Sequence, residues 1–195
     1  MVMADVSPAP AVPSLAELLP GGSSLCVPMT LEEYLAFGET HHDEYYDGLV
    51  FVNPPTDHHA RVARRVTRLF EDACPAGYEV APELGWQATS QVVLRPDIMV
   101  YAPCSRHARL LESPPLLVVE VSSPSTRTQD GGRKREIYAQ GGAPWYWIVD
   151  PYGEAVTIMT NEAGHFITMQ QLDDGLAHEV SEPFPLSLDL TALFA

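Results

Sequence analysis

Apolar residues recur at helical spacing in one segment of the first half of the chain. Four of them fall at i, i+4, i+7 and i+8, namely Val62, Val66, Leu69 and Phe70. This spacing predicts an amphipathic helix over residues 57–73, with Asp57 as its N-cap. Thr30 and Glu33 form a capping-box pattern, which predicts a second, shorter helix over residues 30–38.

Strand signals occupy much of the remaining chain. They predict a hairpin at 44–52 with its turn at Asp47-Gly48, and strands at 78–84, 86–90, 91–94, 98–101, 116–121, 145–150, 155–160 and 166–172. The run at 116–121 is so uniformly apolar that we expect a central strand, buried on both faces. A helix over 130–140, with Asp130 as N-cap, links it to 145–150 by a parallel crossover. The predicted fold class is therefore mixed α/β, ending in a C-terminal meander.

Length and composition favour one domain. The chain has 195 residues, and its first 22 are rich in Pro, Ala and Ser. We expect a mobile N-terminal arm over residues 1–27 and a single domain over 28–195, with the tail after residue 184 packed on the core. No run is long enough to span a bilayer, no signal peptide is evident, and the three cysteines are far apart. These features predict a cytoplasmic protein with reduced thiols.

The charge distribution is uneven. The formal net charge is −15, which argues against a nucleic-acid partner, because phosphate binding depends on cations. All eleven Lys and Arg residues, however, lie between positions 61 and 135. The central third could present a basic surface within an acidic protein. Alternatively, the totals reflect only composition and solubility.

Arginines form a second stripe on the predicted long helix. They are Arg61, Arg64, Arg65 and Arg68. Such a row is commonly a solvated face, but here it holds much of the positive charge, so contact with a phosphate backbone is a second interpretation. His59 precedes the stripe and could contact a phosphate or a water, or have only a surface or capping role.

Two acids and one lysine carry the candidate chemistry. Asp97 begins one predicted strand, and Glu120 lies near the end of another. If these strands are neighbours, both carboxylates meet at one edge of the sheet and could bind a hard cation such as Mg²⁺. Lys134 is the only lysine of the chain, and its compact ammonium could stabilise charge in the transition state. The simpler alternative is a buried salt bridge between Glu120 and Lys134 or an arginine.

Other candidate catalytic residues and motifs have less support in the sequence. Asp130, Lys134 and Tyr138 are spaced to share one helix face, which could look into the same site. Ser122, Ser123 and Ser125 raise the possibility of a serine esterase, but no GxSxG elbow surrounds them. The sequence also contains no GxGxxG or Walker loop.

Seven short motifs follow one another in the chain. They are Met29-Thr-Leu-Glu-Glu-Tyr34, Glu44-Tyr-Tyr-Asp-Gly-Leu-Val50, Asn53-Pro-Pro with His59, Arg95-Pro-Asp97, Val119-Glu-Val-Ser-Ser-Pro-Ser-Thr126, Asp130 with Lys134 and Tyr138, and Gly142-Ala-Pro-Trp-Tyr-Trp-Ile-Val-Asp-Pro151. In this order they resemble the Uma-two family of restriction-endonuclease-like proteins, within the PD-(D/E)XK nuclease superfamily. The resemblance covers residues 28–195. It implies a restriction-endonuclease-like core, with a mixed central sheet flanked by helices.

The resemblance also implies a site. Asp97, Glu120 and the backbone carbonyl of Val121 would bind Mg²⁺ or Mn²⁺, and Glu44 matches an acid from an N-terminal element. The superfamily pattern places a lysine where this chain has Ser122, and Lys134 is its natural substitute.

The resulting hypothesis is a metal-dependent endonuclease that acts on DNA, with no membrane association. Analogy with the superfamily adds a homodimer. The alternative is a nuclease-fold protein without turnover, acting as a binding or assembly module.

Overall fold

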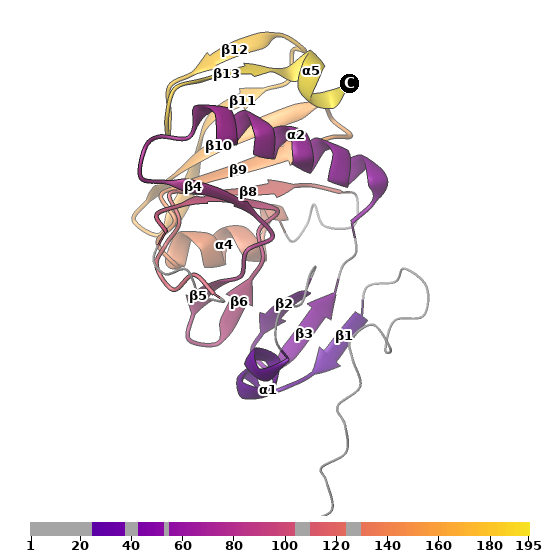
Figure 1. Ribbon diagram of the computed structural model, residues 1–195, viewed down its shortest axis with the longest axis vertical. Helices are drawn as coiled ribbons and strands as arrows, with labels where there is room; N and C mark the ends of the chain where they lie inside the picture. The colour runs from indigo at the N-terminus through magenta and orange to yellow at the C-terminus, as the bar shows by residue number, and fades with distance from the viewer. Residues whose placement is uncertain (1–24, 38–42, 53–54, 104–109, 124–129) are drawn as a thin grey trace, which may run out of the picture.

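The computed structural model describes residues 25–37, 43–52, 55–103, 110–123 and 130–195, so residues 1–24 of the predicted N-terminal arm lie outside it. The predicted end of the arm at residue 27 is wrong, because residues 25–27 belong to a strand that pairs with residues 50–52. Its main layer is a six-stranded sheet in the order β11-β10-β9-β8-β7-β4 (Figure 1). The strands are β4 (Glu79–Pro82), β7 (Ile98–Tyr101), β8 (Leu117–Val121), β9 (Trp145–Asp150), β10 (Ala155–Glu162) and β11 (His165–Leu172). Only β8 and β9 pair in parallel, as the predicted crossover requires.

The central strand β8 is buried on both faces, and its alternating side chains enter two different cores. Leu117 and Val119 pack in a core covered by helix α2 (Asp57–Ala73), together with the C-terminal residues 180–194. Val118 packs in a second core with helix α4 (Arg133–Gln140). The helices therefore lie on opposite sides of the sheet (Figure 1). Glu120 shares the α4 side with Val118 because strand side chains alternate.

A second, five-stranded sheet has the order β1-β3-β2-β6-β5. Its strands are β1 (Leu25–Pro28), β2 (Asp43–Tyr46), β3 (Leu49–Val52), β5 (Trp86–Thr89) and β6 (Val92–Leu94). The predicted turn at Asp47-Gly48 is present, with φ of 44° and 92°, conformations that suit Asp and Gly in a tight hairpin. The short helix α1 (Leu31–Ala36) begins at the predicted capping box, in which Thr30 and Glu33 bond reciprocally.

Two predicted helix caps are wrong. Thr56, and not Asp57, caps α2, because its hydroxyl accepts from the backbone N–H of His59 and Asp57 is already helical. Helix α4 begins at Arg133 with Gly132 as its N-cap and no side-chain cap bond. Asp130 is instead turned inward, as described below, because a buried cation competes for its carboxylate.

The C-terminal tail packs on the core as predicted. It adds a β-ribbon, β12 (Ala177–Val180) with β13 (Leu186–Asp189), and the helix α5 (Leu190–Phe194). Leu188, Leu190 and Leu193 are buried in the α2 core. None of the helices in the described ranges is long and apolar enough to cross a membrane.

Candidate active site

The two predicted carboxylates meet because β7 and β8 are antiparallel neighbours. Ile98 pairs with Val119, so the start of β7 lies beside the end of β8. Asp97 precedes β7 by one residue, and its Oδ2 accepts from the backbone N–H of Val121 at 2.6 Å. This bond fixes Asp97 next to the strand end that carries Glu120. The sheet edge expected from the sequence is therefore present.

Lys134 reaches the same place from α4. Its Nζ lies 3.2 Å from Glu120 Oε1 and 2.9 Å from Glu44 Oε1. Glu44 comes from β2 of the other sheet, so three elements distant in sequence meet at one ammonium. All three side chains are nearly buried, at 9% exposure for Lys134, 8% for Glu44 and 4% for Glu120. The salt bridge considered as the alternative for Glu120 exists, and it includes the lysine proposed for catalysis.

Two tyrosines hold the carboxylates in place. The hydroxyl of Tyr138 donates to Glu120 Oε1 at 2.5 Å, and that of Tyr46 donates to Glu44 Oε2 at 3.0 Å. Burial raises the pKa of Tyr138 well above its usual range, so this hydroxyl keeps its proton as a donor. Asp130, Lys134 and Tyr138 all reach the same cluster, as their spacing suggested, although Asp130 precedes α4 and does not share its face.

Asp130 and Ser122 form the back of the cluster. Ser122 Oγ donates to Asp130 Oδ2 at 3.1 Å, and Asp130 Oδ1 lies 3.8 Å from Lys134 Nζ. The backbone carbonyl of Asp130 accepts from Tyr146 at 3.0 Å. Ser122 thus supports a carboxylate that faces the lysine. Ser125, named with it above, lies outside the described residues.

Burial and charge set the protonation of the central pair. Burial raises the pKa of Glu120 well above its usual range; Lys134 opposes this rise, while Asp97, Asp130 and Glu44 add to it. Burial alone would lower the pKa of Lys134, but the charges of Glu120 and Glu44 outweigh it and raise that pKa. Lys134 is therefore a permanent cation at neutral pH. Glu120, with its raised pKa, is reluctant to ionise beside the other carboxylates.

The pKa of Asp97, unlike that of Glu120, is lowered. Its carboxylate Oδ2 lies 3.1 Å from His59 Nε2, at side-chain exposures of 18% and 13%. Burial would raise the pKa of Asp97, but the hydrogen bond and charge of His59, with the charge of Lys134, outweigh it and lower that pKa. Burial lowers the pKa of His59, and Asp97 more than compensates, so that pKa is raised. The two candidate ligands therefore differ, one being readily ionised and the other reluctant.

The arginine stripe of α2 divides into different environments. Arg61 pairs with Asp57 at 3.0 Å on the exposed surface. Arg65 donates to the backbone carbonyl of Leu193 at 3.0 Å and so ties α2 to α5. Arg64 and Arg68 are exposed. Arg64 also lines a cavity that reaches His59 and Asp97.

The donor set suits a hard cation that is completed by other ligands. Within the described ranges, no three His, Cys, Asp or Glu side chains form a complete metal-binding cluster. Hydrogen bonds between described residues use Asp97 Oδ2 and Glu120 Oε1, leaving the second oxygen of each carboxylate available. Mg²⁺ commonly takes one or two carboxylates plus phosphate and water, so two acids are sufficient. The buried surplus of negative charge also favours a cation.

Sequence reasoning missed two contributors. Tyr46 is two residues from Glu44 on the same strand, and this spacing could have identified it as a neighbour on the same face. Arg95 pairs with the buried Asp43 at 3.0 Å, and its backbone N–H lies 3.4 Å from Glu44 Oε1. Nothing local in the sequence signals this pair, because Asp43 begins β2 and Arg95 follows β6, far along the chain.

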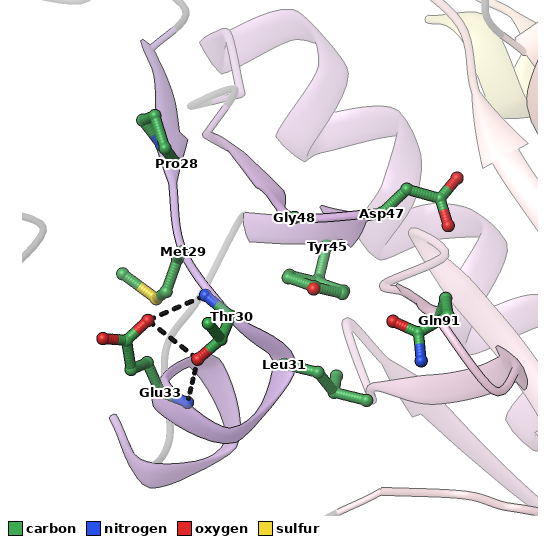
Figure 2. A pocket seen from close by; sticks show the side chains of 9 residues that line it. All are labelled: Pro28, Met29, Thr30, Leu31, Glu33, Tyr45, Asp47, Gly48 and Gln91. Carbon is green, nitrogen blue, oxygen red and sulfur yellow. Dashed lines mark hydrogen bonds between the residues drawn. The ribbon is translucent and has the colours of Figure 1, made fainter.

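An open hollow of about 610 Å³ lies at the five-stranded sheet (Figure 2). It lacks the free carboxylate oxygens of the site at Asp97 and Glu120. Its two carboxylates are already engaged. Glu33 bonds Thr30 in the capping box, and Asp47 lies 3.5 Å from Arg133. Glu44 does not line it, since it alternates with Tyr45 along β2. The hollow is therefore separate from the carboxylate site.

Comparison with known proteins identifies a family. Residues 31–192 match the family model Uma2, described as "Putative restriction endonuclease". The chain belongs to the Uma2 family. The family match spans every site residue described above.

Solved structures show the same fold. A crystal structure from Anabaena variabilis ATCC 29413, described as a putative nuclease belonging to DUF820, matches with a TM-score of 0.69 at 21% identity. The alignment covers 86% of this Uma2 chain and 98% of that one. Curated protein sequences yield no match. The fold is thus a mixed α/β nuclease fold, as the sequence predicted.

Proposed function

We propose that this Uma2 protein is a divalent-metal-dependent nuclease of the PD-(D/E)XK type that hydrolyses phosphodiester bonds in DNA. The observation that carries the proposal is that Asp97 and Glu120 approach one edge of the sheet from adjacent antiparallel strands, with the buried ammonium of Lys134 3.2 Å from Glu120. Burying three carboxylates about one lysine is expensive unless the charge serves a purpose. A phosphodiesterase site gives it one.

The residues that would hold the metal are Asp97, Glu120 and the backbone carbonyl of Val121. When bound, Mg²⁺ or Mn²⁺ would polarise a phosphoryl oxygen and lower the pKa of a water. Asp97 is ionised over the physiological range because its pKa is lowered. Glu120 would lose its proton as the cation binds, since a divalent charge opposes the effect of burial.

Lys134 and Glu44 would act on the reacting phosphate and the attacking water. Lys134 remains charged, and Glu44 and Glu120 fix its Nζ at 2.9 and 3.2 Å, so the ammonium is preorganised to stabilise charge that develops on phosphate. Glu44 is held in turn by Tyr46, which leaves it suited to orienting a water. Ser122 supports this arrangement through Asp130.

The test is cleavage of plasmid and single-stranded DNA with Mg²⁺ or Mn²⁺ against chelator. We expect metal-dependent cleavage that falls by about 10³-fold or more in Asp97→Ala, because both a ligand and the anchor of the β8 end are lost. Asp72→Ala, which removes an exposed acid of α2, is the matched control. Full activity in Asp97→Ala would refute the proposal.

The second candidate is a nuclease-fold binding or assembly module without turnover. It is favoured by Lys134, which already sits between Glu44 and Glu120 as an internal counter-ion. Calorimetric Mn²⁺ titration separates the two. The nuclease requires binding to the wild-type protein that is lost in Glu120→Gln, whereas the module requires neither binding nor cleavage.

A further inference from the structure

A cavity of about 240 Å³ lies between α2 and the end of β4, and it opens directly onto Asp97. Its helix wall is formed by small side chains one turn apart, Ala60, Ala63 and Thr67, and its opposite wall includes Pro82. The walls are fixed relative to the site, since Glu83 donates its backbone N–H to the carbonyl of Asp97 at 3.3 Å. The cavity is therefore a built extension of the carboxylate site.

The lining has the chemistry of a nucleotide subsite. The walls are mostly apolar, with Ala60, Ala63 and Pro82, and suit packing against the face of a base. Arg64 stands at the cavity and is exposed, and it forms no ion pair with any residue in the described ranges. A free guanidinium is well matched to a phosphate oxygen pair. Two neighbouring arginines differ, because Arg61 pairs with Asp57 and Arg65 bonds Leu193.

The size of the cavity limits what can enter. At about 240 Å³ it is smaller than the roughly 300–1,000 Å³ of pockets for drug-sized ligands, so it can take one base but not a base pair. A nucleotide that enters must have left the duplex or never have been in one. We propose that this cavity receives one unpaired nucleoside beside the scissile phosphate, so that the protein selects single-stranded or locally unpaired DNA.

This inference rests on the proposed function, because the phosphate at Asp97 is the reference point for the cavity. Binding can nevertheless be measured without cleavage. The probe is a fluorescein-labelled oligodeoxynucleotide, alone or annealed to its complement, titrated with the full-length protein in chelator at low salt. Fluorescence anisotropy gives the dissociation constants.

We expect the single strand to bind at least about tenfold more tightly than the duplex. Ala60→Leu fills the cavity from an exposed, helix-compatible position and should weaken single-strand binding about tenfold. Ala36→Leu, the same change at an exposed position of α1, controls for added apolar surface. Arg64→Ala should weaken binding more than Arg68→Ala, which removes the same charge from the same helix outside the cavity.

Equal affinity for both strand types, or wild-type affinity in Ala60→Leu, would overturn the inference. The outcome is separable from that of the nuclease test. Single-strand binding that depends on Ala60, without cleavage in any metal, would refute the nuclease and keep the cavity assignment. Metal-dependent cleavage that prefers duplex and ignores Ala60→Leu would keep the nuclease and refute the cavity assignment.

Discussion

The carboxylate pair has two unlike sides. On the α4 side, Glu120, Glu44 and Lys134 are nearly buried, and tyrosine hydroxyls bond the two glutamates. On the α2 side, Asp97 and His59 are partly exposed and border a cavity. The pKa of Glu120 is raised on the first side, and that of Asp97 is lowered on the second. The comparison separates a rigid charged anchor from an accessible face suited to substrate.

The largest effect should come from breaking the α4 side. Lys134→Met leaves Glu44, Glu120 and Asp130 without their shared cation, so we expect a loss of about 3–5 kcal/mol in the free energy of unfolding. Nuclease activity should fall at least about 10²-fold. Urea denaturation and the cleavage assay measure the two effects.

A double variant separates the structural and catalytic contributions of Lys134. Lys134→Met with Glu120→Gln removes one uncompensated charge and should regain part of the stability while remaining inactive. Unchanged stability in Lys134→Met alone would show that the buried cluster is not held by this cation.

The pH dependence of the free energy of unfolding should differ between wild type and Glu120→Gln. The pKa of Glu120 is raised in the fold, so the native state holds a proton that the unfolded chain releases near pH 4.5. This contribution to stability is greatest below that pH and declines as pH rises towards the folded-state value. Each unit by which the fold raises the pKa corresponds to about 1.4 kcal/mol.

The glutamine variant lacks this titration and keeps an acceptor for Tyr138 and Lys134. Without metal it should therefore be more stable than wild type at pH 8 and equal to it below pH 4. Urea denaturation across this range in chelator makes the measurement. A wild-type protein whose advantage over the variant grows with pH would contradict the assigned direction.

The smallest effects should come from the α2 side. Arg65→Ala removes the bond to the Leu193 carbonyl and should cost about 1 kcal/mol of stability. Arg64→Ala, one residue earlier on the same helix, should change stability by less than about 0.5 kcal/mol, because its side chain is exposed. Thermal unfolding of both variants tests the division of the stripe, and equal losses would contradict it.

Local patterns determined a large part of this protein. The alternating and continuous apolar runs predicted the strands of both sheets except β1, because side-chain period reports strand burial directly. The acid within the apolar run of β8 marked Glu120, since an isolated buried charge requires a partner. Asp97 and Lys134 followed from their positions at a strand start and on a helix face. The site was therefore predictable to the level of which residues approach one edge of the sheet.

Only the tertiary structure decided how those residues divide their contacts. Asp130 reads as a helix cap in sequence, yet the buried Lys134 and Ser122 draw its carboxylate inward. The sequence spacing predicts one stripe of arginines on α2. In the structure, however, Arg65 donates to the backbone carbonyl of Leu193 in the C-terminal tail, whereas Arg61 pairs with Asp57 on the exposed surface. The cavity beside Asp97 exists because small residues of α2 face the end of β4. Such contacts join segments far apart in the chain, and local spacing carries no information about them.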